Sequence, residues 1–361
     1  MRIALVSTCA LPTPPDAYGG TELVVAALAK ELIVLGHEVT VYATGDSHAA
    51  GDVRWVFAKH CWPPDTISEQ KHVQFAWNDI RAQKIPFDVV HVQQAHSLEL
   101  AGNYANRTAL TIHHARSNSL VEHYVAFPEV SFVAISARQA ELIPEVPIAR
   151  VIHHRLDPAG YRFGSGEGGY CLFLGRLSAQ KAPHIAIDAA RHAGALLRIA
   201  GEAHPDGLKY FERKVKPRLA DTRRVEWLGE APVSVKTELL RAANALLFPL
   251  GWEEPFGLVM IESMLVGTPV IAFARGSAPE VIDEGVTGYL VRDEAEMSYR
   301  LKRIVTFDRK RCRQRALERW SAGRMARNYQ ALYEQISARH PHRVVEEKRS
   351  WTSLKRATTP P

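Results

Sequence analysis

The chain has 361 residues, of which 46% are hydrophobic and 23% charged, with 23 Gly and 21 Pro. This composition is typical of a globular protein and excludes collagen-like, mucin-like and disordered chains. A mass of 40.2 kDa exceeds what one hydrophobic core usually serves, so we expect two domains. The net charge is +6, but residues 1–150 hold 11 Lys and Arg against 15 Asp and Glu, a net −4, which leaves +10 for the rest. We therefore expect an anionic ligand in the second half.

Three classes of protein are disfavoured by simple patterns. No helix-turn-helix, zinc-finger or RNA-binding pattern accompanies the basic charge, so we expect no nucleic-acid partner. No apolar run reaches the ~18 residues that span a bilayer, and the apolar start is too short for a signal peptide. The cysteines are too widely spaced for a CxxC pair or a zinc ribbon; they are Cys9, Cys61, Cys171 and Cys312. We expect a reduced, cytoplasmic chain.

Short β-rich runs alternate with helical stretches along the chain, which is the pattern of parallel sheets with crossover helices. The first predicted strands are Arg2–Val6, Glu38–Ala43, Val89–Val92, Ala109–His113, Val130–Ile135 and Arg150–His153. The second set is Tyr170–Leu174, Leu196–Ala200, Arg224–Leu228, Ala245–Phe248, Pro269–Phe273 and Gly288–Val291. Between the first two strands, Thr21–Leu35 has helical spacing, with Thr21 as the expected N-cap and Gly36 after its end.

The two sets of strands predict two doubly wound halves, joined near Pro158–Gly169, where Gly and Pro are frequent. Residues from Ala295 to about Ile336 are predicted to be helical, with a break at Trp320-Ser321. We predict one domain over 1–160 and a second over 161–320. A helix over 321–339 would cross back to the first domain, and 340–361 would form a flexible basic tail.

Ligands of parallel α/β sheets gather at the carboxyl ends of the strands, so the loops there are the candidate sites. After the first strand, Gly19 and Gly20 stand directly before a helix, in the run Tyr18-Gly19-Gly20-Thr21-Glu22. Without Cβ atoms, they allow a diphosphate to approach the backbone N–H groups at the helix start. An ordinary tight turn is the alternative.

Two cations follow the strand that ends at Leu174. Arg176 comes directly after Gly175. Lys181 stands five residues later, just before a predicted helix with Pro183 in its first turn. Arg grips phosphate in a bidentate manner, and Lys adds a mobile point charge, so the pair suits a leaving diphosphate. A solvated surface pair is the alternative.

Two carboxylates follow the strand that ends at Phe248. Glu254 and Glu262 are separated by seven residues, and a helix starting near Gly257 would set them on the order of 10 Å apart along its axis. That separation suits a sugar at one end and a ribose at the other, with free backbone N–H groups at Gly257 and Leu258 between them. Glu262 stands among apolar neighbours, which argues against a merely solvated role.

Together these motifs resemble the retaining glycosyltransferases of family 4, which have the two-Rossmann GT-B fold. The resemblance runs to about Gln335 and includes further short motifs, which are Asp88-Val89-Val90-His91, Thr111-Ile112-His113, Gly276 with Pro279-Glu280, and Thr287-Gly288. The glycine loop and Ala134-Ile135-Ser136 are most similar to the shorter bacterial members.

The resemblance implies roles for the matched positions. Arg176 and Lys181 would hold the donor diphosphate, Glu262 the ribose, and Glu254 the hydroxyls of the transferred sugar. The donor-binding set also includes Gly19, Gly20, Phe256, Gly257 and Leu258, and the catalytic set is His113, Glu254, Arg176 and Lys181. His113 would contact the donor sugar near the reacting carbon, with a packed strand-end histidine as the alternative.

Three further histidines lie near predicted strand ends of the first domain: His91, His96 and His114. They are candidates for orienting the acceptor, although buried structural histidines are an equal alternative. Metal ligation ranks last, because GT-B enzymes generally stabilise the leaving diphosphate with basic side chains and helix dipoles.

The implied function is transfer of a sugar, with retention, from a UDP-sugar, or next a GDP-sugar, to an acceptor hydroxyl. We expect no metal and no resident cofactor. The acceptor is a small molecule, a glycan or a lipid-linked saccharide, bound by first-domain loops, chiefly Tyr42–Val53 and His60–Lys71. Glu254 is alternatively a nucleophile. The alternative functions are a GT-B nucleotide-sugar epimerase and a silent sugar-nucleotide-binding subunit.

Two positions depart from the family pattern, and one basic segment needs its own interpretation. Ala182 and Arg155 stand where the family often has Gly. The basic segment contains Arg300, Lys302, Arg303, Arg309, Lys310, Arg311, Arg313, Arg315 and Arg319. We favour a solvated basic face over docking on anionic membrane at the inner face, because the predicted acceptor domain is acidic.

Overall fold

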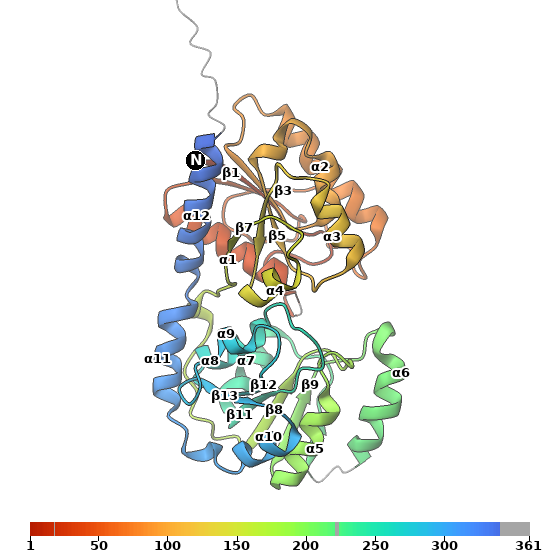
Figure 1. The fold of residues 1–361 in the computed structure, drawn as a ribbon, viewed down its shortest axis with the longest axis vertical. Helices are drawn as coiled ribbons and strands as arrows, with labels where there is room; N and C mark the ends of the chain where they lie inside the picture. The colour runs from red at the N-terminus through yellow and green to blue at the C-terminus, as the bar shows by residue number, and fades with distance from the viewer. Residues whose placement is uncertain (18, 221–223, 340–361) are drawn as a thin grey trace, which may run out of the picture.

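The computed structural model describes residues 1–17, 19–220 and 224–339, which form two α/β units (Figure 1). Within these residues, the first sheet has seven strands in the order β3-β2-β1-β4-β5-β6-β7, and the second has six in the order β10-β9-β8-β11-β12-β13. All paired strands are parallel. The predicted tail, 340–361, lies outside the described residues, as does Tyr18.

Every predicted strand is present, and each end lies within two residues of the predicted one. The strands are β1 (Arg2–Val6), β2 (Glu38–Tyr42), β3 (Asp52–Arg54), β4 (Val89–Val92), β5 (Thr108–Ile112), β6 (Ser131–Ala134), β7 (Ile148–Val151), β8 (Tyr170–Leu174), β9 (Leu196–Ala200), β10 (Val225–Trp227), β11 (Ala245–Phe248), β12 (Val270–Phe273) and β13 (Gly288–Val291). The edge strand β3 was not predicted, because its three residues include two charged ones and show no apolar run.

Helices connect the strands. They are α1 (Gly20–Val34), α2 (Thr66–Ala82), α3 (Asn118–Val125), α4 (Ala137–Leu142), α5 (Pro183–Ala193), α6 (Leu208–Tyr210), α7 (Val233–Ala242), α8 (Leu258–Leu265), α9 (Ala278–Val281), α10 (Glu294–Leu301), α11 (Arg309–Trp320) and α12 (Ala322–Arg339). Short 3₁₀ or π turns are η1 (Ala95–Leu100), η2 (Gly102–Arg107), η3 (Pro158–Gly160), η4 (Pro205–Gly207), η5 (Phe211–Val215), η6 (Lys216–Ala220) and η7 (Ile304–Thr306). The predicted helix break at Ser321 is confirmed, and a second break separates α10 from α11.

The start of α1 corrects one expectation. Thr21 is not the N-cap, because the helix begins at Gly20 and Gly19 takes the cap position. Gly19 has φ +140°, and a Cβ there would lie 2.8 Å from Pro15 Cβ. Only glycine fits this turn, so the helix start is set by the backbone rather than by a capping hydroxyl. The helix ends at Val34, one residue before the predicted end at Leu35.

Each sheet has a hydrophobic core on both faces. Strands of the first sheet alternate between a cluster shared with α1 and α12 and a cluster shared with α2 and α3. Leu5 on β1, for example, is fully buried beside Val41 on β2 and His91 on β4. The second sheet packs between α7, α8 and α11 on one face and α5 and α10 on the other. Burial on both faces explains why these strands are continuous apolar runs.

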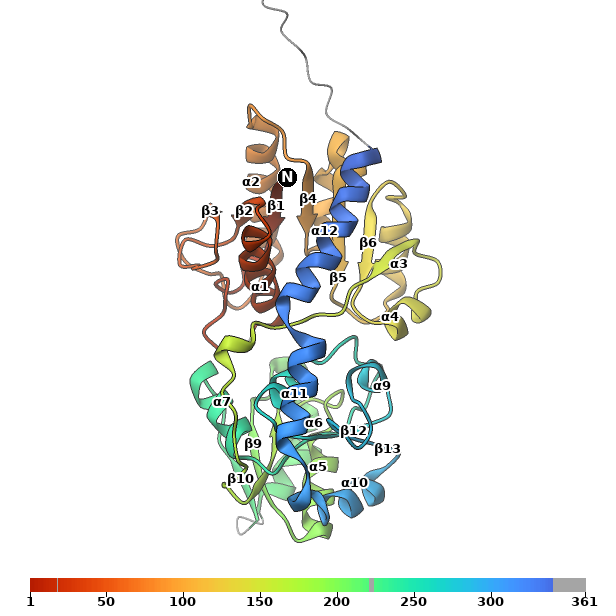
Figure 2. The ribbon, with the colours of Figure 1, turned by 90° about the vertical axis from the view of Figure 1, so that its left-hand side faces the viewer.

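The last helix, α12, lies along the first sheet and beside α1, although it follows the second domain in sequence (Figure 2). Two of its tyrosines reach buried polar groups of the strands. Tyr333 Oη lies 2.7 Å from His91 Nδ1, and Tyr329 Oη lies 2.8 Å from Thr111 Oγ1. His91 Nε2 is in turn 2.7 Å from that hydroxyl. This buried network fixes the position of α12 on the sheet.

The chain passes between the domains twice, and the two connections touch. Leu156 donates its N–H to Trp320 O at 3.1 Å, and Ala322 donates to Leu156 O at 2.9 Å. Leu156 and Ser321 thus form an isolated parallel bridge. We call this place the interdomain crossing.

Both sheets have the strand order of a doubly wound fold, with the direction of winding reversed between β1 and β4 and between β8 and β11. Such switch points leave a crevice at the carboxyl ends of the strands. The loops that the sequence singled out follow β1, β8 and β11, so all three begin beside a switch point.

Candidate functional site

The glycine loop of the first domain meets the second domain at the start of α8. A Cβ on Gly20 would lie 3.2 Å from Leu258 Cδ1. Leu258 also packs against the core cluster of the first sheet, while Leu23 packs against that of the second. The structure therefore brings Gly19, Gly20, Gly257 and Leu258 together across the two domains.

Gly257 is the N-cap residue of α8, and its left-handed backbone conformation favours glycine. Its φ is +78°, and a Cβ would lie 2.9 Å from Met260 Cε and 3.0 Å from Phe248 Cε1. No described side chain caps this helix. Met260 N donates to Gly257 O at 3.0 Å, so the backbone N–H groups that precede it in the first turn are the ones available to an anion. The helix starts where the sequence predicted.

Lys181 and Glu254 form an ion pair between the loops that follow β8 and β11. Lys181 Nζ lies 2.6 Å from Glu254 Oε2, and the side chains are 15% and 9% exposed. Trp252 Nε1 donates to the same oxygen at 2.7 Å, and Lys181 Nζ lies 5.2 Å from the centre of the Phe248 ring. The second carboxylate oxygen, Oε1, accepts no hydrogen bond from a described residue.

Arg176 lies at the mouth of the same loop pair, half-buried. Within the described part of the chain, its guanidinium has no hydrogen-bond or ion-pair partner. The two loops are joined beside it, because Gly251 N donates to Gln180 O at 2.8 Å. Arg176 is thus a permanently charged group that is available to a ligand.

Glu262 lies in the second turn of α8, and its side chain is 5% exposed. Lys236 Nζ on α7 lies 2.6 Å from Glu262 Oε1, and Tyr161 Oη donates to the same oxygen at 3.2 Å. No described residue donates to Oε2. One carboxylate oxygen therefore fixes the side chain, and the other can accept hydrogen bonds from a hydroxyl.

His113 lies at the end of β5 beside another histidine. Its Nε2 is 2.8 Å from Gln93 Oε1, and its ring stacks on His154 with centroids 5.1 Å apart. Burial, and after it the neighbouring His154, lower the pKa of His113 well below its usual value. The imidazole is therefore neutral near pH 7.

Some predicted site residues lie elsewhere. His91 is 1% exposed, and both of its ring nitrogens contact the α12 network, so it is a structural histidine and does not face an acceptor. The Phe256 ring is also buried, with its centroid 5.2 Å from that of His154 and 6.0 Å from that of Trp320. It supports the loop rather than lining an open donor site.

The other two acceptor-side candidates remain at the surface of the first domain. His96 is half-buried, with Nδ1 4.0 Å from Glu69 Oε2. His114 is exposed, and its carbonyl accepts a hydrogen bond from Gln139. His96 Nε2 is buried without a hydrogen-bond partner among the described residues. No observation assigns either histidine to an acceptor, so both stay predictions.

Family models match the two domains separately. Residues 18–160 match the model described as Glycosyltransferase Family 4, and residues 164–319 match the model described as Glycosyl transferases group 1. The chain belongs to the family 4 glycosyltransferases.

Several known proteins are similar to this glycosyltransferase over nearly its whole length. Spore coat protein SA of Bacillus subtilis is 24% identical in an alignment that is 383 residues long. The alignment covers 92% of this chain and 99% of that protein. AviGT4, a glycosyltransferase involved in avilamycin A biosynthesis, has a TM-score of 0.71 at 24% identity, covering 94% and 98% of the two chains. HepE of Anabaena, solved with UDP and glucose, has a TM-score of 0.70 at 19% identity, covering 92% and 99%. The predicted GT-B fold is confirmed.

Several groups of the glycosyltransferase site were not predicted. Lys236 and Tyr161 hold Glu262, while His154 and Gln93 contact His113. None of them belongs to a short motif with its partner, since Lys236 and Glu262 are 26 residues apart in sequence and Tyr161 and Glu262 are 101 apart. Glu22, in the quoted glycine loop, also proves to be buried and accepts a hydrogen bond from Thr8.

Ala182 stands where the family often has Gly, and its backbone conformation shows why glycine suits this position. It precedes α5 with φ +48° and ψ +48°, the left-handed conformation that glycine adopts readily. A non-glycine residue there costs about 1 kcal/mol in backbone strain. The methyl group is 1% exposed, so its burial offsets part of that cost.

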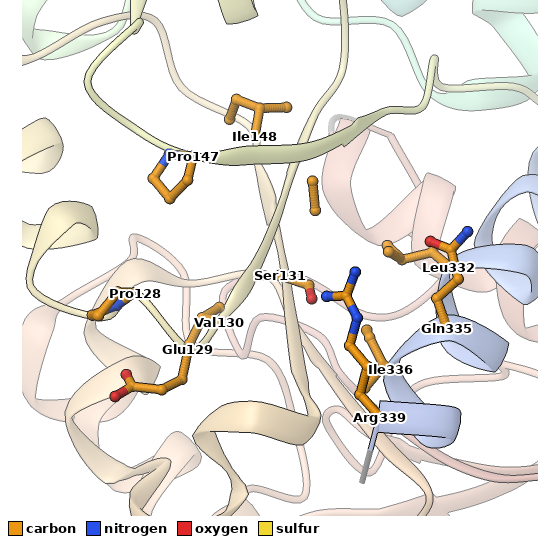
Figure 3. A pocket seen from close by; sticks show the side chains of 11 residues that line it. Pro128, Glu129, Val130, Ser131, Pro147, Ile148, Leu332, Gln335, Ile336 and Arg339 are labelled. Carbon is orange, nitrogen blue, oxygen red and sulfur yellow. The ribbon is translucent and has the colours of Figure 1, made fainter.

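A separate hollow of about 330 Å³ lies on the first domain, between β6, β7 and the end of α12 (Figure 3). Ser131, Ile148, Leu332 and Arg339 are among its lining residues. None of the predicted site residues lines it, and it is remote from the loops that follow β1, β8 and β11. It is distinct from the candidate site.

The basic segment of the glycosyltransferase is less solvated than we predicted. Arg309 donates to three backbone carbonyls and to Thr268 Oγ1, and Arg313 donates to the carbonyls of Tyr161 and Leu265. These guanidinium groups anchor α11 to the second domain instead of facing water. Among the described helices, none is long and apolar enough to cross a membrane.

Polar contacts join the two domains beside the site. Glu280 of α9 accepts from the backbone N–H groups of Ala137 at 2.7 Å and Arg138 at 2.8 Å, at the start of α4. His153 Nε2 lies 2.9 Å from the same carboxylate. Arg138 Nε also donates to Glu253 at 3.0 Å. A carboxylate of the second domain thus occupies a helix N-terminus of the first.

Replacing Glu280 with Gln is expected to lower stability at pH 7 by about 1 kcal/mol, because charge-assisted hydrogen bonds are lost. Burial alone would raise the pKa of Glu280, but hydrogen bonds from His153, Arg138 and Ala137 outweigh it and lower the pKa below its usual 4.5. Its contribution is therefore present above pH 4.5 and is lost as the pH falls through the lowered pKa. Thermal unfolding from pH 7 to pH 4 measures this.

The control is Glu141→Gln, since Glu141 is an exposed carboxylate that binds the same Arg138 at 3.3 Å. It should keep the pH dependence of the wild type. If Glu280→Gln had the same stability and pH dependence as the wild type, the contact would contribute nothing.

Proposed function

We propose that this glycosyltransferase transfers a sugar from a nucleoside-diphosphate sugar to an acceptor hydroxyl, with retention at the anomeric carbon. A UDP-sugar is the favoured donor and a GDP-sugar the next, since the neighbour HepE has been solved with UDP-glucose. The observation that carries the proposal is the set of polar side chains at the switch point of the second sheet. Among the described residues, the Arg176 guanidinium has no partner, and Glu262 has one carboxylate oxygen without a donor.

The donor would bind across the start of α8. Glu262 Oε2 would accept hydrogen bonds from the ribose hydroxyls, while Lys236 and Tyr161 hold Oε1. Arg176, Lys181 and the first backbone N–H groups of α8 would contact the diphosphate. Gly19 and Gly20 would approach it from the first domain.

Glu254 would bind hydroxyls of the transferred sugar through Oε1. Its other oxygen receives two donors, Lys181 Nζ at 2.6 Å and Trp252 Nε1 at 2.7 Å. Such donors stabilise the carboxylate charge and reduce its tendency to attack carbon. This arrangement favours sugar binding over the nucleophile alternative.

The chemistry follows from where charge develops. Cleavage of the anomeric bond produces an oxocarbenium-like sugar and a diphosphate anion, and Arg176 and Lys181 stabilise the anion. The departing phosphate accepts the proton of the acceptor hydroxyl on the same face of the sugar. Neutral His113, oriented by Gln93, contacts the donor sugar without adding a positive charge beside the forming cation.

The remaining assignments belong to the same proposal. The first domain, 1–160, would bind the acceptor and the second, 161–320, the donor, with 321–339 returning to the first. The protein would act in the cytoplasm without a metal or a resident cofactor, and the acceptor would be a small molecule, a glycan or a lipid-linked saccharide. Closing the domains would exclude water that hydrolyses the donor.

Calorimetric titration with UDP, GDP, ADP and NAD, each with and without EDTA, tests the proposal. We expect one nucleoside diphosphate, with UDP the favoured one, to bind with a Kd on the order of 1–100 µM, and EDTA to leave that Kd unchanged. Binding of NAD alone, or of none of the four, would contradict the proposed donor site. Loss of binding in EDTA would contradict metal independence alone.

A further inference from the structure

Arg155 is a buried arginine without an acceptor for most of its donors. The residue is 7% exposed, and its Nε and Nη1 are buried with no hydrogen-bond partner among the described residues. Burying an unpaired guanidinium is costly, so native proteins normally supply acceptors for each N–H group. This position is also one of the two where the sequence departs from the family pattern.

Arg309 provides the comparison within the same chain. It is also largely removed from water, and burial lowers its pKa to about 10. Its guanidinium nitrogens nevertheless donate to Gly164 O, Ala243 O, Arg241 O and Thr268 Oγ1. Arg309 is thus supplied with acceptors, whereas Arg155 Nε and Nη1 have none among the described residues.

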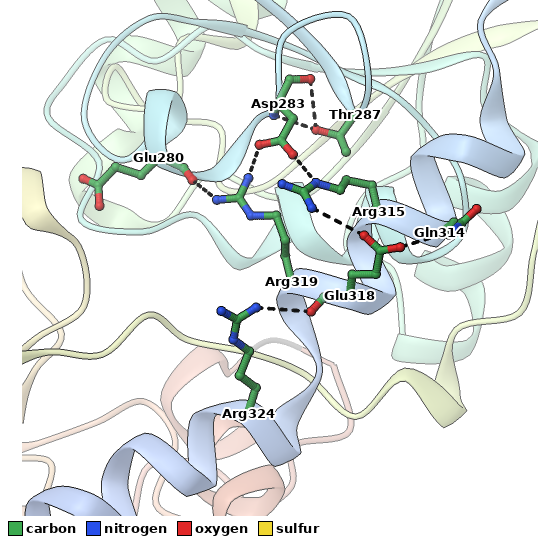
Figure 4. Close-up of polar contacts among 8 residues, drawn as sticks. All are labelled: Glu280, Asp283, Thr287, Gln314, Arg315, Glu318, Arg319 and Arg324. Carbon is green, nitrogen blue, oxygen red and sulfur yellow. Dashed lines mark hydrogen bonds and ion pairs between the residues drawn. The ribbon is translucent and has the colours of Figure 1, made fainter.

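More positive charge gathers around Arg155 because of the interdomain crossing. Arg155 precedes Leu156, whose backbone bonds to Trp320 and Ala322 bring the end of α11 and the start of α12 beside it. Arg319 and Arg324 lie on these two helix ends (Figure 4), and Arg327 lies one turn further along α12. Burial, and after it the charges of Arg324, Arg319 and Arg327, lower the pKa of Arg155 to about 10, so it remains charged at pH 7.

The neighbouring carboxylates do not neutralise this cluster. Asp283 pairs with Arg319, but it also pairs with Arg315 at 2.5 Å. Among the described residues, the Arg324 guanidinium donates only to the Glu318 carbonyl, at 3.4 Å. The Glu31 carboxylate of α1 and Arg327 Nη1 both lie beside Gly323, but no ion pair joins them within the described chain.

We propose that the hinge arginine cluster, Arg155 with Arg319, Arg324 and Arg327, binds a small soluble anion that carries a phosphate group. Arg155, Arg324 and Arg327 form no ion pair within the described part of the chain, and their guanidinium charges match a dianion better than a carboxylate. The several oxygens of a phosphate can also accept from more than one of these segments at once. The burial of Arg155 favours a small ion over a membrane or a nucleic acid as the ligand.

The location gives the site a consequence. The linker and the α11–α12 junction are the two connections between the domains, and a phosphate bound to both would join them. Anion binding would therefore stabilise one relative arrangement of the two domains, at a place distinct from the proposed donor site.

Thermal unfolding with orthophosphate tests the proposal. At about 10 mM phosphate, balanced against chloride at equal ionic strength, the Tm of the wild type should rise by about 2–4 °C. Arg155→Met should abolish this rise. Arg176→Met, which removes a cation of the proposed donor site, should retain it. No rise in the wild type, or an equal rise in Arg155→Met, would overturn the proposal.

A surface variant covers the case in which Arg155→Met does not fold. Arg327 is exposed, so Arg327→Gln should fold normally. Calorimetric titration with orthophosphate should then give a Kd about 5–10 times that of the wild type, as expected for one lost charge-assisted contact. An unchanged Kd would overturn the proposal.

Discussion

Arg176→Met is expected to lower kcat/KM for sugar transfer by about 100- to 1000-fold while leaving Tm within about 1 °C of the wild type. The loss follows from removing a fixed positive charge from the leaving diphosphate. The unchanged stability follows from the surroundings of Arg176, since no described residue bonds to its guanidinium. Release of UDP from the sugar donor measures the first quantity, and calorimetric unfolding measures the second.

Lys181→Met is the matched comparison. It should lower kcat/KM to a similar extent, but it should also lower Tm, because the buried Glu254 carboxylate would keep Trp252 as its only donor among the described residues. The two variants therefore separate catalysis from stability. If Arg176→Met kept kcat/KM within about threefold of the wild type, Arg176 would be a solvated surface residue.

Glu262→Ala is expected to raise the Kd for UDP by about 10- to 100-fold, because a carboxylate that receives ribose hydroxyls contributes about 1.5–3 kcal/mol. The helix that carries Glu262 is buried around it, and only Oε2 is available for the ligand. Calorimetric titration with UDP gives the Kd directly.

The alanine variant also leaves the Lys236 ammonium without its partner, so a second pair of variants isolates the contact with the nucleotide. Glu262→Gln preserves the shape of the side chain and should raise the Kd about tenfold. Lys236→Met removes the ion pair but keeps the carboxylate, and should change the Kd less than either Glu262 variant. Unchanged UDP affinity in both Glu262 variants would exclude Glu262 from the ribose site.

Much of the fold could be predicted from the sequence, because strands that are buried on both faces appear in it as continuous apolar runs. The strands β1, β4, β8, β9, β11 and β13 have the predicted bounds. The edge strand β3 carries no such signal, since Asp52 and Arg54 face water and each other. The start of α1 was misplaced because a glycine backbone, and not the Thr21 hydroxyl, determines it.

The sequence could predict those residues of the candidate site that lie close together in one loop and the helix after it. Glu254 and Glu262 could be found because they share one loop and helix, and Arg176 and Lys181 because they share another. The partners Lys236 and Tyr161 come from other elements and depend on tertiary packing, as do the contacts of His113 with Gln93 and His154. His91 was a candidate site residue because it belongs to a motif near a strand end. The pleat of the strand turns its side chain toward α12 and into the core, so it lies outside the site.

The return of α12 to the first sheet affects how the chain folds during synthesis. Met325, Tyr329, Tyr333 and Ile336 supply one side of the core that β1, β2 and α1 begin to form. The first 160 residues leave the ribosome long before these side chains exist, whereas residues 161–320 contain a complete second sheet with its covering helices. Domains usually become native in the order of synthesis. Here the domain made first is expected to finish only after the second, because its final helix is translated after residues 161–320.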